Sequence, residues 1–291
     1  MKPMAALTPE NLRHLSSLFR LGNNPAATVY DSLGGDFFLS PAPGWLNLGL
    51  WEGRGDAAEA EAAVRRLVTT LARDLPMDAD IVDVANGLGA QDLVIRETLR
   101  PRSLVAINIT ESQLVHGRAR LMTALAKPVA GDAARLPLAD ETADGMISVE
   151  AAFHFSSRRE FFREARRVLR PGGVLVMSDV SAERGPRTAS EAIAGLSNLR
   201  AWGINRRSLM SADAIESALL TAGFTGVEVH DVSGRVFAPA IRFFRQRLES
   251  TEDAPLLYRR GSGLLLRQWE LLARRGMMKY LLIKAETPSR A

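Results

Sequence analysis

The sequence predicts an α/β fold built on a doubly wound, mostly parallel sheet. From residue 81 onward, short β-type runs alternate with amphipathic helical stretches, and this alternation is typical of a parallel sheet. Such runs begin near residues 81, 103, 144 and 174, and the first leads directly into a Gly-Leu-Gly turn. A later run lies near residue 227, and the last run is MKYLLIKA, which begins at residue 278.

The segments around these runs predict helical caps. Residues 1–55 combine a helical stretch with a loop rich in glycine, proline and aromatic residues, which indicates an N-terminal lid. Residues 56–180 form the ligand-binding core, and residues 181–210 a helical insertion on the substrate side. Residues 211–291 complete the sheet, with a helical cap insertion at about 236–275. Because the carboxyl ends of parallel strands form the binding crevice in such folds, we expect the caps there.

Composition excludes several classes of chemistry. The chain has no cysteine, which rules out disulfides, thiolate metal sites and a cysteine nucleophile. The sequence has no His-x-His, no His-Glu-x-x-His and no Gly-x-Ser-x-Gly, so we predict neither a metal site nor hydrolase chemistry.

Charge and hydropathy point to a cytoplasmic protein with a small-molecule substrate. The net charge of +4 is spread along the chain without a basic stripe, so we expect no nucleic-acid partner. The start lacks the apolar core of a signal peptide, and no apolar run approaches the about 20 residues that span a bilayer, so no membrane partner is expected. The oligomeric state stays open.

A glycine turn follows the first predicted strand in IVDVANGLGAQD. Asp83 lies near the end of the strand, and Gly87 and Gly89 allow a ligand to approach the backbone closely. A dinucleotide site would have a third glycine where Asp92 stands, and a carboxylate facing a pyrophosphate would repel it. A ligand that carries an ammonium and a sulfonium suits this acidic strand end better.

This segment resembles the first motif of the class I S-adenosylmethionine-dependent methyltransferases, an acidic residue followed by three alternating glycines. Asp83, Ala85, Gly87 and Gly89 occupy those positions. Ala85 replaces the first glycine, which adds one methyl group to the pocket floor and can lower affinity for the cofactor. The match continues over residues 81–180. The resemblance implies a Rossmann-like sheet of seven strands, with S-adenosylmethionine as cofactor and S-adenosylhomocysteine as product.

The resemblance also assigns the cofactor contacts. The second strand ends at Asn108, where the family commonly carries an acidic residue that binds the ribose; INITESQL looks like the branch with a non-acidic residue there. In GDAARLPLAD, Asp132 is implied to accept a hydrogen bond from the adenine amino group, although a simple turn role is the alternative. Glu150 is implied to lie near the methionine portion. The implied cofactor contacts are Tyr30, Asp83, Ala85, Asn86, Gly87, Gly89, Asn108, Ile109, Gln113, Asp132, Ala133 and Glu150.

Two residues at the predicted carboxyl edge of the sheet are candidates for catalysis. His154 stands where natural-product O-methyltransferases often carry a histidine base, and EAAFHF resembles that region in macrolide and sugar O-methyltransferases. An imidazole with an ordinary pKa near neutrality accepts a hydroxyl proton readily. Asp179 ends the next predicted strand and is expected to orient the imidazole or to bind substrate. Structural roles for both residues remain the alternatives.

Aromatic residues are the candidates for substrate contacts. Tyr30, Trp45 and Trp51 resemble a segment that closes over cofactor and substrate in the same branch, and an aromatic ring attracts a sulfonium. Core packing is the alternative for both tryptophans. Phe153, beside the candidate base, is the third expected substrate contact.

The predicted function is methylation of a hydroxyl on a largely apolar natural product, such as a polyketide, macrolide or lipid-like alcohol. The abundance of Leu, Phe and Met in the cap segments suits such a substrate. Two alternatives remain: a methyltransferase-like cyclase or isomerase that keeps the cofactor site without methylating, and a C- or N-methyltransferase. The departures at Ala85 and Asn108 keep the first of these open.

Overall fold

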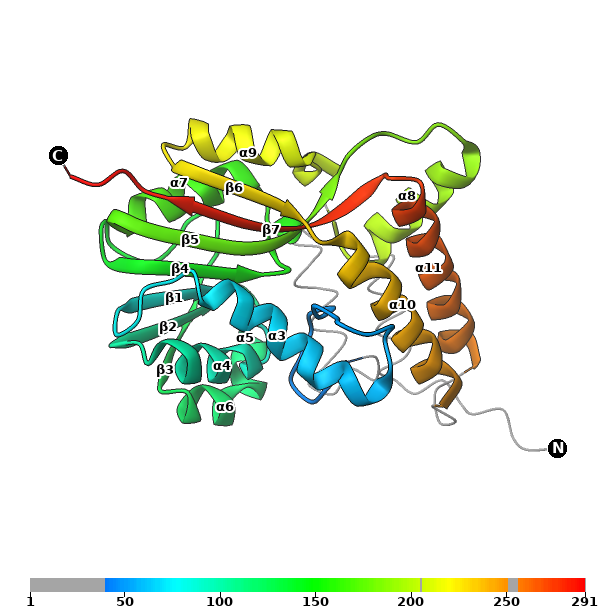
Figure 1. Cartoon of the computed structure of the whole chain (residues 1–291), viewed down its shortest axis with the longest axis horizontal. Coiled ribbons are helices and arrows are strands. Elements are labelled where there is room, and N and C mark those ends of the chain that lie inside the picture. The colour runs from blue at the N-terminus through cyan, green and yellow to red at the C-terminus, as the bar shows by residue number, and fades with distance from the viewer. Residues whose placement is uncertain (1–39, 205, 251–255, 291) are drawn as a thin grey trace.

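The computed structural model describes residues 40–204, 206–250 and 256–290, and a seven-stranded sheet runs through its centre (Figure 1). The strand order is β3-β2-β1-β4-β5-β7-β6, with β7 antiparallel to both neighbours and the other strands parallel. This confirms the predicted fold class. The strands are β1 (Asp80–Val84), β2 (Ser103–Asn108), β3 (Ala126–Ala130), β4 (Ala143–Val149), β5 (Leu169–Ala182), β6 (Thr225–Asp231) and β7 (Met278–Glu286).

Helices cover both faces of the sheet. They are α3 (Ala60–Ala72), α4 (Ala90–Leu99), α5 (Glu111–His116), α6 (Arg118–Thr123), α7 (Arg158–Val168), α8 (Ala189–Ala201), α9 (Ala212–Thr221), α10 (Ser233–Ser250) and α11 (Leu256–Arg274), with the 3-10 turns η1 (Ala57–Glu59), η2 (Ala152–His154) and η3 (Arg206–Ser208). Side chains of α3, α4 and α10 share one hydrophobic cluster, and those of α7 and α9 share another. The two clusters are the cores on the two faces.

Local sequence explains where several of these elements start. Helices α7, α8 and α9 follow Ser157, Thr188 and Ser211, and each of these side chains accepts a hydrogen bond from the backbone N–H three residues on. Strand β3 was not expected from the sequence. It contains Pro128 and is largely exposed, which is tolerated because β3 is an edge strand.

The predicted insertions form a group of helices at one end of the sheet. In Figure 1, α8, α10 and α11 lie together beyond the ends of β5 and β7. Helix α11 packs against both α8 and α10. The insertion expected at about 236–275 is thus a pair of helices, and α8 comes from the insertion expected at 181–210. None of the helices in the described part of the chain has the length and apolar character needed to cross a bilayer.

Candidate functional site

The turn after β1 passes three times through left-handed backbone. The φ angles are +64° at Ala85, +61° at Gly87 and +82° at Gly89. Glycine adopts this conformation without penalty, whereas a residue with a Cβ does not. A methyl group at Gly87 would contact Leu46 Cδ1 at 3.5 Å, while one at Gly89 would lie 3.3 Å from atoms of the α5–α6 region. Gly87 therefore faces the loop above the turn, and Gly89 permits close packing below it.

Asp83 and Asp92 form a buried carboxyl pair beneath this turn. Gln91 Nε2 donates to both oxygens of Asp83 at 2.8 Å, and Asn86 Nδ2 donates to Asp92 at 3.0 Å. Burial raises the pKa of Asp83 well above its usual value and the pKa of Asp92 to about 7. Asp92 is fully buried, so its carboxyl group lies beneath the turn and does not face a ligand above it. It supports the turn from below.

Asn108, the predicted ribose contact, is hydrogen-bonded to Gln113, another predicted cofactor contact. Asn108 Nδ2 donates to Gln113 Oε1 at 2.9 Å, and Asn108 Oδ1 accepts from the N–H of Thr110 at 2.9 Å. One lone pair of that oxygen is left for a ligand. The neighbouring Ile109 is 44% exposed, an open apolar side chain at the carboxyl end of β2.

Asp132 and Ala133 follow β3 and lie next to this group. Gly131 N–H donates to the backbone oxygen of Asn108 at 3.0 Å, which fixes the two strand ends side by side. Asp132 Oδ1 accepts from the N–H of Ala134 at 2.9 Å, so its carboxylate shapes the turn. Ala133 is buried. The structure thus brings the predicted nucleoside-binding residues to one edge of the sheet.

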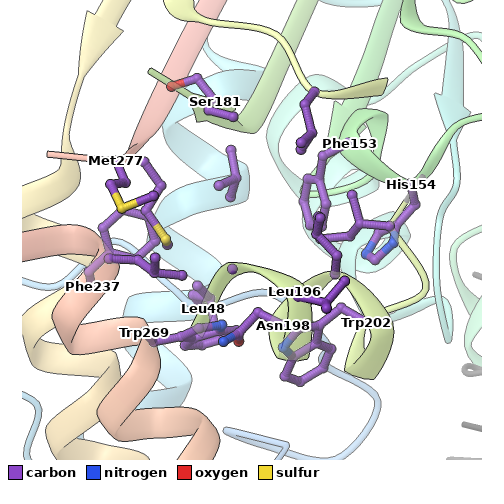
Figure 2. Close-up of a pocket in the computed structure, with 18 of the residues that line it drawn as sticks. Leu48, Phe153, His154, Ser181, Leu196, Asn198, Trp202, Phe237, Trp269 and Met277 are labelled. Atoms are coloured by element: carbon purple, nitrogen blue, oxygen red, sulfur yellow. The ribbon is translucent and has the colours of Figure 1, made fainter. Parts of the chain in front are cut away.

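A cavity of about 510 Å³ lies between that edge and the cap helices (Figure 2). Its lining is mostly apolar, and Leu46, which covers Gly87, belongs to it. The cavity therefore adjoins the glycine turn. The main apolar residues that line it are Leu46, Leu48, Phe153, Leu196, Leu199, Trp202, Phe237, Phe244, Leu266, Trp269, Leu272 and Met277.

Glu150 lines the cavity at the end of β4 in a strained backbone conformation, with φ at +50°. Its Oε1 accepts from the N–H of Leu48 at 2.6 Å and from the hydroxyl of Tyr280 at 2.5 Å. Burial raises the pKa of Glu150 to about 7, against the effect of these two donors. Sequence analysis missed Tyr280, which reaches the site only because β7 pairs with β5.

His154 also lines the cavity, on η2. Its ring centroid lies 4.1 Å from that of Phe153, and both side chains appear at the same wall in Figure 2. Burial and the charge of Arg158 lower the pKa of His154 to about 3, although a hydrogen bond to the Trp202 backbone acts in the opposite direction. The expected pKa near neutrality is therefore wrong for this environment, and the imidazole is neutral at physiological pH.

Asp179 is engaged by Arg158, a residue that sequence analysis missed. Arg158 Nε lies 2.9 Å from Asp179 Oδ2, and both side chains are almost completely buried. Asp179 Oδ1 also accepts from the N–H groups of Phe153 and Val180, at 3.1 and 2.9 Å. Asp179 thus fixes the start of η2, and the expected orienting bond from Asp179 to His154 is not among its described contacts.

The aromatic residues predicted to contact substrate divide into two groups. Trp45 and Trp51 are buried in the hydrophobic core, and Trp51 Nε1 donates to the backbone oxygen of Leu48 at 2.8 Å. Neither ring lines the cavity, so the core-packing alternative describes them; Phe153 does line it. Tyr30 lies outside the described residues.

Comparisons with known proteins identify the family of this chain. Residues 82–177 match the family model described as a methyltransferase domain. The erythromycin 3''-O-methyltransferase of Saccharopolyspora erythraea is 30% identical over 241 residues, which cover 77% of this chain and 76% of that protein. The 27-O-demethylrifamycin SV methyltransferase of Amycolatopsis mediterranei is 26% identical, with 84% of this chain and 90% of that protein covered.

Solved structures share the fold. The crystal structure of the 4+2 cyclase SpnF has a TM-score of 0.72 at 20% identity, and covers 91% of this chain and 97% of its own. At that identity the likeness concerns the fold alone. The two sequence relatives match this chain over most of their own length and over most of its length. Together with the shared fold, this match shows that the chain belongs to the class I S-adenosylmethionine-dependent methyltransferases.

Proposed function

We propose that this methyltransferase transfers the methyl group to a hydroxyl of a bulky, largely apolar acceptor. The observation that carries the proposal is the cavity of about 510 Å³, which is lined mostly by apolar side chains and adjoins the glycine turn through Leu46. This volume is in the range of pockets that hold drug-sized ligands. The names of two relatives describe methylation of erythromycin and of a demethylrifamycin, and these names support the same acceptor class.

S-adenosylmethionine is the cofactor, and it supplies a methyl group activated on a sulfonium. We propose that Gly87, Asn108, Ile109 and Asp132 hold the nucleoside, with Glu150 near the methionine portion. The exposed apolar side chain of Ile109 and the free lone pair of Asn108 Oδ1 suit an adenine ring and a ribose hydroxyl. The other contacts implied by resemblance, Tyr30 included, stay predictions.

His154 is the group that we propose to accept the hydroxyl proton first. Its pKa of about 3 keeps the ring neutral, so it accepts a hydrogen bond from the hydroxyl and orients an oxygen lone pair toward the methyl carbon. As the carbon–oxygen bond forms, the oxygen becomes a protonated ether, which is a far stronger acid than an imidazolium. Even a weakly basic imidazole therefore takes this proton.

Substitution of His154 by alanine tests this role. We expect kcat to fall by about 10²- to 10⁴-fold, because a general base contributes about that factor, while the affinity for S-adenosylmethionine is retained. Release of S-adenosylhomocysteine across a panel of macrolide, polyketide and lipid alcohols measures the rate, and calorimetry measures cofactor affinity. If His154→Ala methylates a good acceptor at an unchanged rate, His154 is not the general base.

The same assay separates the acceptor classes. Mass spectrometry and NMR of the product show whether the methyl group lies on oxygen, carbon or nitrogen. A product with methyl on carbon or nitrogen, or one that is rearranged without gaining a methyl group, contradicts O-methylation.

A further inference from the structure

Two carboxylates line the cavity in the described part of the chain, and they differ in their partners. Glu191 is paired with Arg184, at 3.0 Å between Arg184 Nη2 and Glu191 Oε1. Glu150 has only neutral partners, the N–H of Leu48 and the hydroxyl of Tyr280. Within the described residues, Glu150 is therefore the cavity carboxylate that has no cation beside it.

Both donors bind the same oxygen of Glu150. Oε1 receives the hydrogen bonds from Leu48 and Tyr280, which leaves Oε2 for a ligand. The positive φ of Glu150 is a strained conformation, and such a conformation persists only where surrounding contacts impose it. Tyr280 is fully buried and packs edge-on against Phe237, so its hydroxyl is a rigid anchor for the carboxylate.

We propose that Glu150 is the counter-charge of the cofactor's sulfonium and the final acceptor of the proton that the acceptor hydroxyl loses, with Tyr280 as its positioning residue. The counter-charge stands independently of the acceptor, whereas the proton transfer rests on the proposed O-methylation. An oxygen lone pair forms the new bond to the methyl carbon as the carbon–sulfur bond breaks and its electron pair stays on sulfur. The hydroxyl proton passes to His154 and then, across the cavity that both side chains line, to Glu150 Oε2.

The reason is the cost of keeping charges in an apolar cavity. In the proposed arrangement, the sulfonium and the Glu150 carboxylate would form an ion pair before the reaction, and a neutral thioether and a neutral carboxylic acid would remain afterwards. If the proton stayed on His154, an imidazolium and a carboxylate would remain. Even paired charges are costly to bury, so the neutral end state is favoured.

The surroundings of Glu150 suit such a change. Burial raises the pKa of Glu150 to about 7, and the negative charge of Asp179 also raises it. Arg158 forms an ion pair with Asp179. Tyr280 and Leu48 act in the opposite direction, and His154 carries no charge at this pH. A cation nearby lowers the pKa of a carboxyl group, so Glu150 ionises when the sulfonium arrives and takes up a proton when the cation is gone.

Calorimetry of cofactor binding tests the proposal without an acceptor. Binding of S-adenosylmethionine and of S-adenosylhomocysteine is measured at pH 7 in phosphate and in Tris, whose different ionisation heats reveal proton release. A carboxyl group with a pKa of about 7 is half protonated at this pH. We therefore expect S-adenosylmethionine to release up to about half a proton more than S-adenosylhomocysteine, and Glu150→Gln to abolish that difference.

Two variants serve as matched controls. Glu191→Gln removes the other cavity carboxylate, whose pKa Arg184 keeps at about 2, so the difference between the ligands is expected to persist. Asp92→Asn removes another carboxyl with a pKa of about 7, but both ligands share the groups nearest the glycine turn, so the difference should again persist. Equal proton release by both ligands, or a difference that survives in Glu150→Gln, overturns the counter-charge.

Tyr280→Phe tests the positioning role and covers the case in which Glu150→Gln does not fold. The change removes a donor that lowers the pKa of Glu150, so the pH midpoint of proton release and the acidic limb of the kcat profile are expected to move upward. An unmoved midpoint refutes positioning by Tyr280. With an acceptor in hand, a kcat that Glu150→Gln leaves unchanged refutes the proton transfer. A preserved calorimetric difference without any O-methylated product contradicts the proposed function alone.

Discussion

Ala85 carries a backbone conformation that suits glycine better than alanine. Its φ of +64° lies directly after β1, where the chain turns toward the cofactor. An L-residue with a Cβ pays about 1 to 2 kcal/mol in this region, partly offset by the greater freedom of an unfolded glycine. The first residue of the turn therefore stores strain that its two glycines do not.

Substitution of Ala85 by glycine is expected to raise the free energy of unfolding by up to about 1 kcal/mol, because it removes this strain. Urea denaturation measures the change. Ala119→Gly, at an exposed position in α6, is the control and is expected to lower the free energy of unfolding by about 0.5 to 1 kcal/mol. Equal losses in the two variants would show that Ala85 is not strained.

The carboxyl pair of Asp83 and Asp92 makes stability depend on pH. Burial raises the pKa of Asp92 to about 7, so the folded state favours its protonated form. Protonation of Asp92 therefore adds to the free energy of unfolding. This contribution is complete below the ordinary pKa of aspartate, near 4, and is lost as the pH rises toward 7. The sign is opposite to that of a carboxylate in a salt bridge.

Asp92→Asn keeps a neutral, hydrogen-bonding side chain at every pH, so its stability relative to the original protein is expected to increase by roughly 1 to 3 kcal/mol between pH 5 and pH 8. Chemical denaturation at both pH values measures this. Glu216→Gln, on the exposed face of α9, is the control and should show no such trend. A pH-independent difference for Asp92→Asn would contradict the raised pKa.

At the scale of elements, α8 forms one wall of the cavity and carries a glycine where a side chain has room. Gly195 lines the cavity, and a Cβ there would have no atom within 4 Å. Glycine inside a helix costs about 1 kcal/mol relative to alanine, so its presence is not explained by helix stability. The space that it leaves is part of the cavity in which we propose that the acceptor binds.

Gly195→Phe is therefore expected to fold and to raise the KM of a bulky acceptor at least about 10-fold through lost cavity volume, with cofactor affinity unchanged. Gly195→Ala is the control: it should stabilise the protein by up to about 1 kcal/mol and leave KM nearly unaltered. Acceptor kinetics and calorimetry with S-adenosylmethionine check both. A KM unchanged in the phenylalanine variant would mean that the acceptor does not occupy this wall.

Strands that are buried on both faces were predictable from the sequence, and elements determined by tertiary context were not. The buried runs of β1, β2, β4 and β5 were recognised because strands covered on both faces read as continuous apolar stretches. Strand β3 was missed, since an exposed edge strand that contains proline lacks that signal.

At the scale of the whole molecule, the position of the site was easier to predict from the sequence than the role of each residue in it. The glycine turn and the strand ends converge as expected, because parallel strands place their carboxyl ends at one edge. Asp179 pairs with Arg158, and Glu150 accepts a hydrogen bond from Tyr280. Both partners lie far along the chain from the residue that they bind. The pKa of His154 depends on burial by the cap, which no local pattern reveals.

The cap helices α10 and α11 leave and re-enter the sheet at adjacent points. The segment between them starts after β6 and ends before β7, where Val232 N–H donates to the backbone oxygen of Tyr280 at 2.9 Å. A segment whose two ends are neighbours can be exchanged as a unit, provided that the replacement keeps the side chains of α10 that pack in the core with α3 and α4. Under the proposed function, we expect such an exchange, by evolution or in engineered chimaeras of related enzymes, to alter the range of acceptors while the strands that carry the glycine turn are kept.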